Sequence, residues 1–255
     1  MLLTTNNLTI GYGTYAVQTD LALEAEGGTM ICMLGKNGCG KSTLLRTLAG
    51  LQPALSGNVC IDGQDIYSLS QQQRATRLAL VLTERLSIDN TTVHDVVAMG
   101  RYPYTSFLGG LTETDENDIS TALEQVGIQH KQNDYFNRLS DGEKQRVLIA
   151  KALAQQTPLI LLDEPTAHLD LNNRIRILLL LRQLAHQTDK CVIISTHELD
   201  LALQLADCIW LMTPKKGVET GTPEALTTSG AFQNAFQDDN FCFLNENGNL
   251  RIKLK

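Results

Sequence analysis

The segment GKNGCGKS at residues 35–42 constrains this chain more than any other stretch. It fits the pattern G-x-x-x-x-G-K-S/T, in which backbone N–H groups and a lysine surround phosphate groups. The apolar run Thr29 to Leu34 predicts a buried strand before it, and Lys41 to Ala49 predicts a helix that begins inside the motif. Together they predict a nucleoside triphosphate site, with Lys41 placed to bring a charge to the β- and γ-phosphates. The residues predicted to bind the nucleotide are Gly35, Lys36, Asn37, Gly38, Cys39, Gly40, Lys41, Ser42 and Thr43.

Ionisable side chains follow two later apolar runs, at the points where strands should end. Asp163 and Glu164 come directly after PLILL, and His197 follows CVIIST. Ligands of open α/β sheets bind at the carboxyl ends of the strands. We therefore expect Asp163 to hold Mg²⁺ together with the Ser42 hydroxyl, and Glu164 to orient or deprotonate an attacking water. His197 is interpreted either as a contact of the γ-phosphate or as a solvated loop histidine.

Composition narrows the class of protein. The chain has 255 residues, of which 43% are hydrophobic, and a net charge of −7. No Lys/Arg-rich stripe is present to neutralise phosphates, so we expect no nucleic-acid partner. The six cysteines are scattered without ligand spacing, which indicates buried reduced thiols. No apolar run approaches the ~20 residues of a spanning helix, so any membrane role is expected to be peripheral.

Strand-like apolar runs alternate with helical segments along the chain, which predicts an α/β fold with a mainly parallel sheet. Between about 85 and 155 the periodicity becomes helical, notably over 91–99 and 112–126, which predicts a helical insertion in an α/β frame. A further amphipathic helix is expected over 175–186. Strands are expected over residues 2–10, 21–26, 29–34, 57–63, 77–82, 158–163, 191–195 and 209–212.

A second anion site is predicted inside the helical insertion. The segment LSDGE at residues 139–143 opens a helix that continues through KQRV. The hydroxyl of Ser140, the backbone of Gly142 and the helix N-terminus can together receive an anion.

These motifs, in this order, make the chain resemble the nucleotide-binding subunit of an ATP-binding cassette (ABC) transporter. Residues 35–42 match the Walker A motif, residues 159–163 match the Walker B strand, and residues 139–143 match the signature LSGGQ with Asp and Glu as variants. The resemblance covers residues 1 to about 225. It implies a P-loop NTPase core with an N-terminal antiparallel β part and an inserted helical subdomain. The implied division is a core over 1–84 and 156–225, a helical subdomain over 85–155, and an extension of unknown role over 226–255.

The resemblance also implies roles for individual residues. Glu164 matches the catalytic glutamate and His197 the switch histidine, which join Lys41 as the implied catalytic residues. Tyr12 is similar to the aromatic residue that stacks on the nucleotide base, although a tyrosine in a turn is more often structural. In this family the signature serves the ATP held by a second subunit, which assigns that role to Ser140, Gly142 and Glu143.

Partners follow from the same resemblance. Two such subunits sandwich two ATP molecules, so the chain is expected to form a homodimer, to bind ATP and Mg²⁺, and to drive transmembrane permease subunits from the cytoplasmic face of the cell membrane. The segment GRYPY at 100–104 makes the chain resemble the ATP-binding subunits of bacterial importers for iron-siderophore, haem and cobalamin. This resemblance implies that a solute-binding protein is an indirect partner. The alternatives are an exporter subunit and a soluble ABC ATPase of DNA repair or translation, but the chain has neither a long coiled coil nor a second cassette.

Thr83 departs from the family pattern. The family has glutamine at the end of the strand before the helical insertion, and Thr83 aligns with that position. The possible outcomes are a loop that closes further in, ligation of Mg²⁺ by Glu84 instead, and an absent contact. We predict a water-mediated contact from Thr83 rather than direct ligation by Glu84. On this interpretation, basal ATP hydrolysis survives substitution of Thr83.

An aromatic connector lies within the helical insertion and consists of Tyr102, Tyr104 and Phe107. Exposed aromatic residues there would form an apolar patch that docks on the permease. The competing interpretation is that they form the core of the small subdomain.

Overall fold

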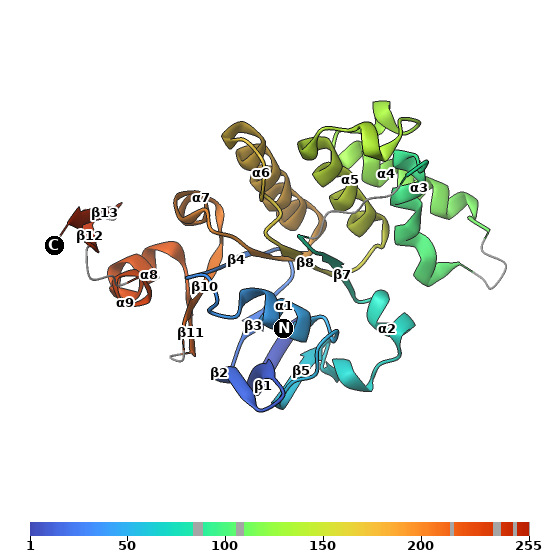
Figure 1. The fold of residues 1–255 in the computed structure, drawn as a ribbon. Helices are drawn as coiled ribbons and strands as arrows, with labels where there is room; N and C mark the ends of the chain where they lie inside the picture. The colour runs from blue at the N-terminus through green and yellow to red at the C-terminus, as the bar shows by residue number, and fades with distance from the viewer. Residues whose placement is uncertain (84–88, 106–109, 215–216, 237–240, 247–248, 255) are drawn as a thin grey trace.

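A computed structural model describes residues 1–255 except 84–88, 106–109, 215–216, 237–240, 247–248 and 255, and Figure 1 gives the arrangement of its elements. Its central feature is a six-stranded sheet of order β11-β10-β4-β9-β8-β7. All neighbouring strands in it are parallel except β10 and β11. Its strands are β4 Met30–Gly35, β7 Leu78–Val81, β8 Leu159–Asp163, β9 Cys191–Ser195, β10 Cys208–Thr213 and β11 Gly217–Gly221.

The N-terminal residues form a second, antiparallel sheet of order β2-β1-β5-β6, with β3 paired to β1. The predicted strand over 21–26 is wrong in its bounds, because Tyr12 pairs with Tyr15 across a tight turn and β2 therefore starts six residues earlier. Only two residues of the predicted stretch, Glu24 and Ala25, pair with β1 as β3. The strands are β1 Leu3–Tyr12, β2 Tyr15–Leu21, β3 Glu24–Ala25, β5 Ser56–Ile61 and β6 Gln64–Asp65.

Both faces of the central sheet are covered, which is why its strands read as continuous apolar runs. Along β4, Met30 and Cys32 pack into a core shared with the helices of one face, whereas Ile31 and Met33 pack into a core shared with the antiparallel sheet. Figure 1 places α6 and α7 over one face and α1 between the other face and the antiparallel sheet. These helices are α1 Lys41–Leu48, α6 Leu171–Thr188 and α7 Leu199–Leu205.

A group of helices lies beyond the β7 edge of the central sheet (Figure 1). Thr112 caps α4 as predicted, because its hydroxyl accepts the Asp115 N–H while the Asp115 carboxylate accepts the Thr112 N–H. Tyr102 and Tyr104 of the aromatic connector lie in the short 3-10 helix η2. The proposed bounds of 85–155 for this subdomain remain a prediction. Its elements are α3 Val93–Ala98, η2 Met99–Tyr104, α4 Glu113–Gln125, η3 Gln129–Lys131, η4 Phe136–Arg138 and α5 Asp141–Ala154.

The remaining elements do not line the phosphate cavity described below. No helix in the described part of the chain is long and apolar enough to cross a membrane. Among the cysteines whose side chains are described, all five are free, and burial raises the pKa of the Cys191 thiol to about 12. The elements are η1 Ile66–Ser68, α2 Gln71–Ala75, α8 Pro223–Thr228, α9 Ala231–Ala235, β12 Phe241–Glu246 and β13 Asn249–Leu254.

Candidate functional site

The glycine-rich loop joins the end of β4 to the start of α1 and curls tightly at its glycines. Gly40 caps α1 in a left-handed conformation with φ 105°. A Cβ atom on Gly40 would lie 2.6 Å from Cγ1 of Val17, and one on Gly35 would lie 2.5 Å from the carbonyl oxygen of Met212. Only glycine therefore fits at these two positions. The backbone N–H groups of the first turn of α1 have no partners within the helix, which suits them to phosphate oxygens.

A cavity of about 550 Å³ lies directly over this loop. Lys41 is buried and its Nζ donates to the carbonyl oxygen of Gly35 at 2.9 Å, so its ammonium group lies across the loop. The Tyr12 hydroxyl and Thr43 Oγ1 share a hydrogen bond of 3.0 Å, which places an exposed aromatic ring at the rim of the cavity. The cavity is lined by Tyr12, Val17, Asn37, Gly38, Gly40, Lys41, Ser42, Thr43, Glu164 and His197.

The acids and the histidine singled out in the sequence meet at this same edge of the sheet, because β8 and β9 are neighbours whose last residues, Asp163 and Ser195, pair in register. Glu164 and His197 share a hydrogen bond between Oε1 and Nε2. Asp163 is buried, and its Oδ1 accepts from Ser195 Oγ at 2.6 Å and from Ser42 Oγ at 3.2 Å. The carboxyl ends of these strands thus hold a carboxylate paired with an imidazole beside a second carboxylate, one oxygen of which accepts two hydroxyl hydrogen bonds.

The oxygen donors at this edge fit Mg²⁺. Ser42 Oγ and Asp163 Oδ1 lie 3.2 Å apart beside the phosphate loop. Within the described residues, no three His, Cys, Asp or Glu side chains gather into a metal cage. Mg²⁺ is usually bound through one or two protein oxygens together with phosphates and water, so this pair is an appropriate donor set.

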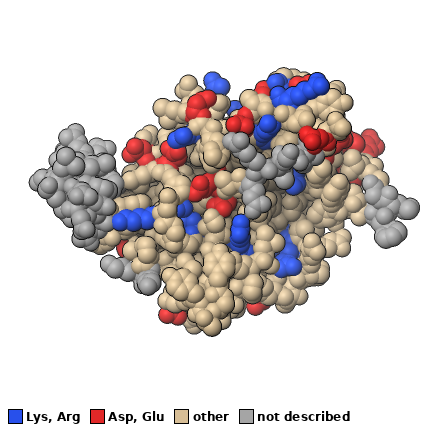
Figure 2. Space-filling view, in the orientation of Figure 1, with Lys and Arg blue, Asp and Glu red and all other residues tan. Residues whose placement is uncertain are grey.

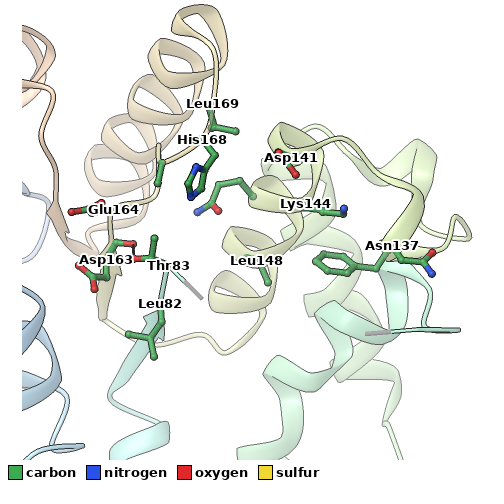
Figure 3. Close-up of a pocket in the computed structure, with 13 residues that line it drawn as sticks. Leu82, Thr83, Asn137, Asp141, Lys144, Leu148, Asp163, Glu164, His168 and Leu169 are labelled. Atoms are coloured by element: carbon green, nitrogen blue, oxygen red, sulfur yellow. Dashed lines mark hydrogen bonds between the residues drawn. The ribbon is translucent and has the colours of Figure 1, made fainter. Parts of the chain in front are cut away.

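Thr83 lies beside Asp163 but interacts with its backbone. Thr83 Oγ1 donates to the carbonyl oxygen of Asp163 at 2.9 Å, as Figure 3 shows. The proposed water-mediated contact between Thr83 and Mg²⁺ remains a prediction. Glu84 lies outside the described residues.

The signature segment contributes Asp141 to the lining of a second cavity, of about 330 Å³ (Figure 3). Ser140 caps α5, and its N–H and hydroxyl both donate to Glu143 Oε2, at 2.9 and 2.8 Å. Lys131 Nζ lies 2.6 Å from Glu143 Oε1, and this contact with that of Ser140 lowers the pKa of Glu143 to about 2. Neither Ser140, Gly142 nor Glu143 lines the cavity over the phosphate loop. The structure therefore brings the two strand-end motifs to the phosphate loop and leaves the signature apart from it.

Known proteins resemble this chain in sequence and in fold. The profile of the ABC transporter family matches residues 18–167. An uncharacterised ABC transporter ATP-binding protein of Methanocaldococcus jannaschii is 41% identical over 223 residues, which cover 88% of this chain and 77% of the relative. This chain belongs to the ABC transporter family. The ferric enterobactin transport ATP-binding protein of Escherichia coli is 36% identical, covering 87% of this chain and 82% of that protein. A solved structure described as a metal-chelate type ABC transporter matches with a TM-score of 0.81 at 27% identity, covering 98% of this chain and 95% of that one.

The protein is thus the ATP-binding subunit of an ABC transporter, an ATPase of the family that hydrolyses ATP to drive transport. The resemblance inferred from the motifs is confirmed, and so is the α/β fold class. On the face seen in Figure 2, basic and acidic side chains are interspersed rather than gathered into a stripe of one sign.

Gln18 supports the phosphate loop of this ABC subunit, a role that no sequence motif indicated. It is buried in β2, where its Nε2 donates to the carbonyl oxygens of Cys39 at 3.0 Å and Thr213 at 2.9 Å. Its Oε1 accepts the N–H of Gly217 at 3.1 Å. One amide therefore ties the phosphate loop to the end of β10 and the start of β11. A glutamine at a buried position of a strand could have indicated this role. However, the strand was predicted over residues 21–26, and Gln18 lies in β2, which ends at Leu21.

Proposed function

We propose that this subunit energises a membrane importer for an iron-siderophore complex, haem or cobalamin, bound peripherally to permease subunits at the cytoplasmic face of the cell membrane. The observation that carries the proposal is the meeting of the phosphate loop, Glu164 and His197 over one cavity, in a chain related to a siderophore transport protein. The likeness to a metal-chelate type transporter supports the same cargo class. A solute-binding protein would then act on the permease from the other side of the membrane.

The residues at the carboxyl ends of the central strands and in the phosphate loop have different roles in ATP hydrolysis. The Lys41 ammonium and the N–H groups of the loop bind the β- and γ-phosphates of ATP. Mg²⁺, held by Ser42 and Asp163, would neutralise charge on the phosphate oxygens. Glu164 accepts a proton from the water that attacks the γ-phosphate, and the hydrogen bond from His197 orients that carboxylate. The products are ADP and inorganic phosphate.

The proposal includes a homodimer with two composite sites. The signature residues Ser140 and Gly142 do not line this chain's own phosphate cavity, so in the proposed dimer they serve the ATP of the second subunit. The N-terminus of α5, a helix of 14 residues, would direct the positive end of its helix dipole toward that phosphate. Closure of the dimer on ATP would move the two groups of helices, and with them the permease.

Reconstitution tests the import proposal. The subunit would be purified with the permease encoded by the genes beside its own and placed in lipid vesicles with the matching solute-binding protein. ATP should drive the movement of one radiolabelled cargo, ferric siderophore, haem or cobalamin, in the import direction. Movement of all three cargoes at the rate of protein-free vesicles, with ATP hydrolysis intact, would refute the assigned cargo class.

The composite site is tested by Glu164→Gln, which should bind ATP, hydrolyse it far more slowly than wild type and accumulate as a dimer in size-exclusion chromatography. The wild-type rate per chain should fall on dilution, because two copies build each site. A monomeric elution of the variant with ATP, together with a dilution-independent wild-type rate, would contradict the proposed dimer.

A further inference from the structure

The peptide group between Asp163 and Glu164 is held from both sides by neighbouring strands. The order β9-β8-β7 places the end of β8 between the ends of the other two. From the β7 side, Thr83 Oγ1 donates to the peptide's carbonyl oxygen at 2.9 Å (Figure 3). From the β9 side, Ser195 Oγ accepts the peptide's N–H from Glu164 at 2.9 Å. Because a peptide group is a rigid plane, fixing its oxygen and its N–H fixes the orientation of the plane.

The backbone conformation that follows this peptide group has to be stabilised by neighbouring contacts. Glu164 has a φ of +47°, a left-handed conformation that residues with a Cβ adopt rarely and that persists where surrounding contacts impose it. The orientation of the plane also sets where the Glu164 carboxylate points, which here is toward His197. Ser195 additionally donates to Asp163 Oδ1 at 2.6 Å, so one hydroxyl positions both strand-end acids.

We propose that Thr83 is a positioning residue, which holds the Glu164 carboxylate in place through the carbonyl group of Asp163 and does not ligate Mg²⁺. The proposal rests on the role given above to Glu164. It departs from the expectation that basal hydrolysis survives changes at Thr83, because the hydrogen bond seen here acts on the catalytic carboxylate of the same chain. Thr83 Oγ1 donates to a backbone carbonyl group, and Thr83 does not line the cavity over the phosphate loop, which Ser42 does line.

The test is Thr83→Val, which keeps the shape of the side chain and removes the donor. We expect kcat for ATP hydrolysis to fall about tenfold, the order of one lost hydrogen bond. KM for ATP and the Mg²⁺ concentration for half-maximal activity should both stay within about twofold, because binding groups are untouched. Thr83→Ser, which keeps the hydroxyl, should recover kcat to within about twofold of wild type.

The matched control is Thr157→Val, at the other end of β8. Thr157 Oγ1 also donates to a backbone carbonyl, that of Leu159 at 3.0 Å, but it lies away from the site. This variant should retain wild-type kcat. In single-turnover measurements, adding Thr83→Val to Glu164→Gln should cause no further loss, because Thr83 acts through that carboxylate.

Three results would overturn the proposal: an unchanged kcat in Thr83→Val, a raised Mg²⁺ requirement in that variant, which indicates metal ligation, or a failure of Thr83→Ser to recover activity. Wild-type kcat in Glu164→Gln alone would instead remove the assigned role of Glu164, and this inference with it. The two failures are therefore distinguishable.

Discussion

Lys131 Nζ lies 2.6 Å from Glu143 Oε1, so a lysine from a short 3-10 helix neutralises the acid at the end of the signature segment. In the proposed dimer this segment approaches the phosphates of the partner's ATP, where an uncompensated carboxylate would repel them. Lys131→Met should raise KM for ATP by about three- to tenfold at low salt, because interactions between charges are weakly screened there. The measurement is the steady-state ATPase rate as a function of ATP and salt concentration.

Two further variants make this prediction specific to charge. Lys131→Arg keeps the cation and should leave KM near the wild-type value. Lys131→Met combined with Glu143→Gln removes both charges and should also recover KM. If the single Lys131→Met variant matches wild type at low salt, Glu143 does not face a phosphate.

The buried carboxylate of Asp115 makes the stability of the helical group depend on acid pH. Hydrogen bonds from the backbone and hydroxyl of Thr112, and then from Arg101 at 2.8 Å, lower the pKa of Asp115 to about 2. Because this pKa is lower in the folded protein, the unfolded chain binds more protons between its ordinary value of 3.8 and about 2. The contribution of Asp115 is therefore complete above about pH 4 to 5 and is lost as pH falls toward 2.

The variant Asp115→Asn should unfold at lower urea concentration at pH 7 and should show a shallower decline of the unfolding free energy between pH 5 and 3. Asp118→Asn is the control, because Asp118 contacts the same guanidinium group at 3.0 Å but is more exposed. Parallel pH profiles for wild type and Asp115→Asn would show that another group is responsible.

Local motifs explain why much of the site was predictable. The phosphate loop and the flanking β4 and α1 are encoded within twenty consecutive residues, and Asp163 and Glu164 follow an apolar run that is buried on both faces. Short-range patterns of this kind specify the strand, the turn and the helix without knowledge of the rest of the chain. The parallel pairing of β8 and β9 then brings the carboxyl ends of these strands together.

The contacts that were not predicted join residues far apart in sequence. Thr83 and the carbonyl group of Asp163 are 80 positions apart, and Gln18 and the carbonyl group of Thr213 are 195 apart. Hydroxyl and amide groups pair with whichever backbone group the fold presents, so residue type alone does not identify the partner. Thr83 was compared with a family position that binds metal, and that comparison gave no reason to expect a backbone partner.

Gln18→Leu should weaken ATP binding, because the carbonyl group of Cys39 in the phosphate loop loses its donor. The leucine also leaves the carbonyl group of Thr213 without this partner, and each of the two buried carbonyl groups that loses its donor should cost about 1–3 kcal/mol. We expect a rise in KM for ATP of about fivefold or more, with a lower melting temperature.

Gln155→Leu is the matched control for this prediction. Gln155 Nε2 likewise donates to two backbone carbonyl groups, those of Ala75 at 2.6 Å and Leu78 at 2.8 Å, but it does not touch the phosphate loop. It should lose stability and keep the wild-type KM. Equal changes of KM in the two variants would mean that general loosening of the fold, rather than the tether to Cys39, affects ATP binding.

The aromatic connector divides into residues of two kinds, which sharpens the test of permease docking. Tyr104 donates its hydroxyl to the carbonyl group of Gln155 at 2.9 Å, and the Arg101 guanidinium lies 4.2 Å from its ring centroid. Tyr102 is 65% exposed, and Phe107 lies outside the described residues. We expect Tyr104→Ala to lower the melting temperature, because it removes a cation–π contact of about 0.5–1 kcal/mol and a hydrogen bond.

Tyr102→Ala should keep the wild-type melting temperature and basal ATPase rate but lose co-purification with the permease, since the exposed ring is available to a partner. The measurements are thermal unfolding of the isolated subunit and recovery of the complex from detergent extracts. Full recovery of the complex with Tyr102→Ala would place the docking surface elsewhere.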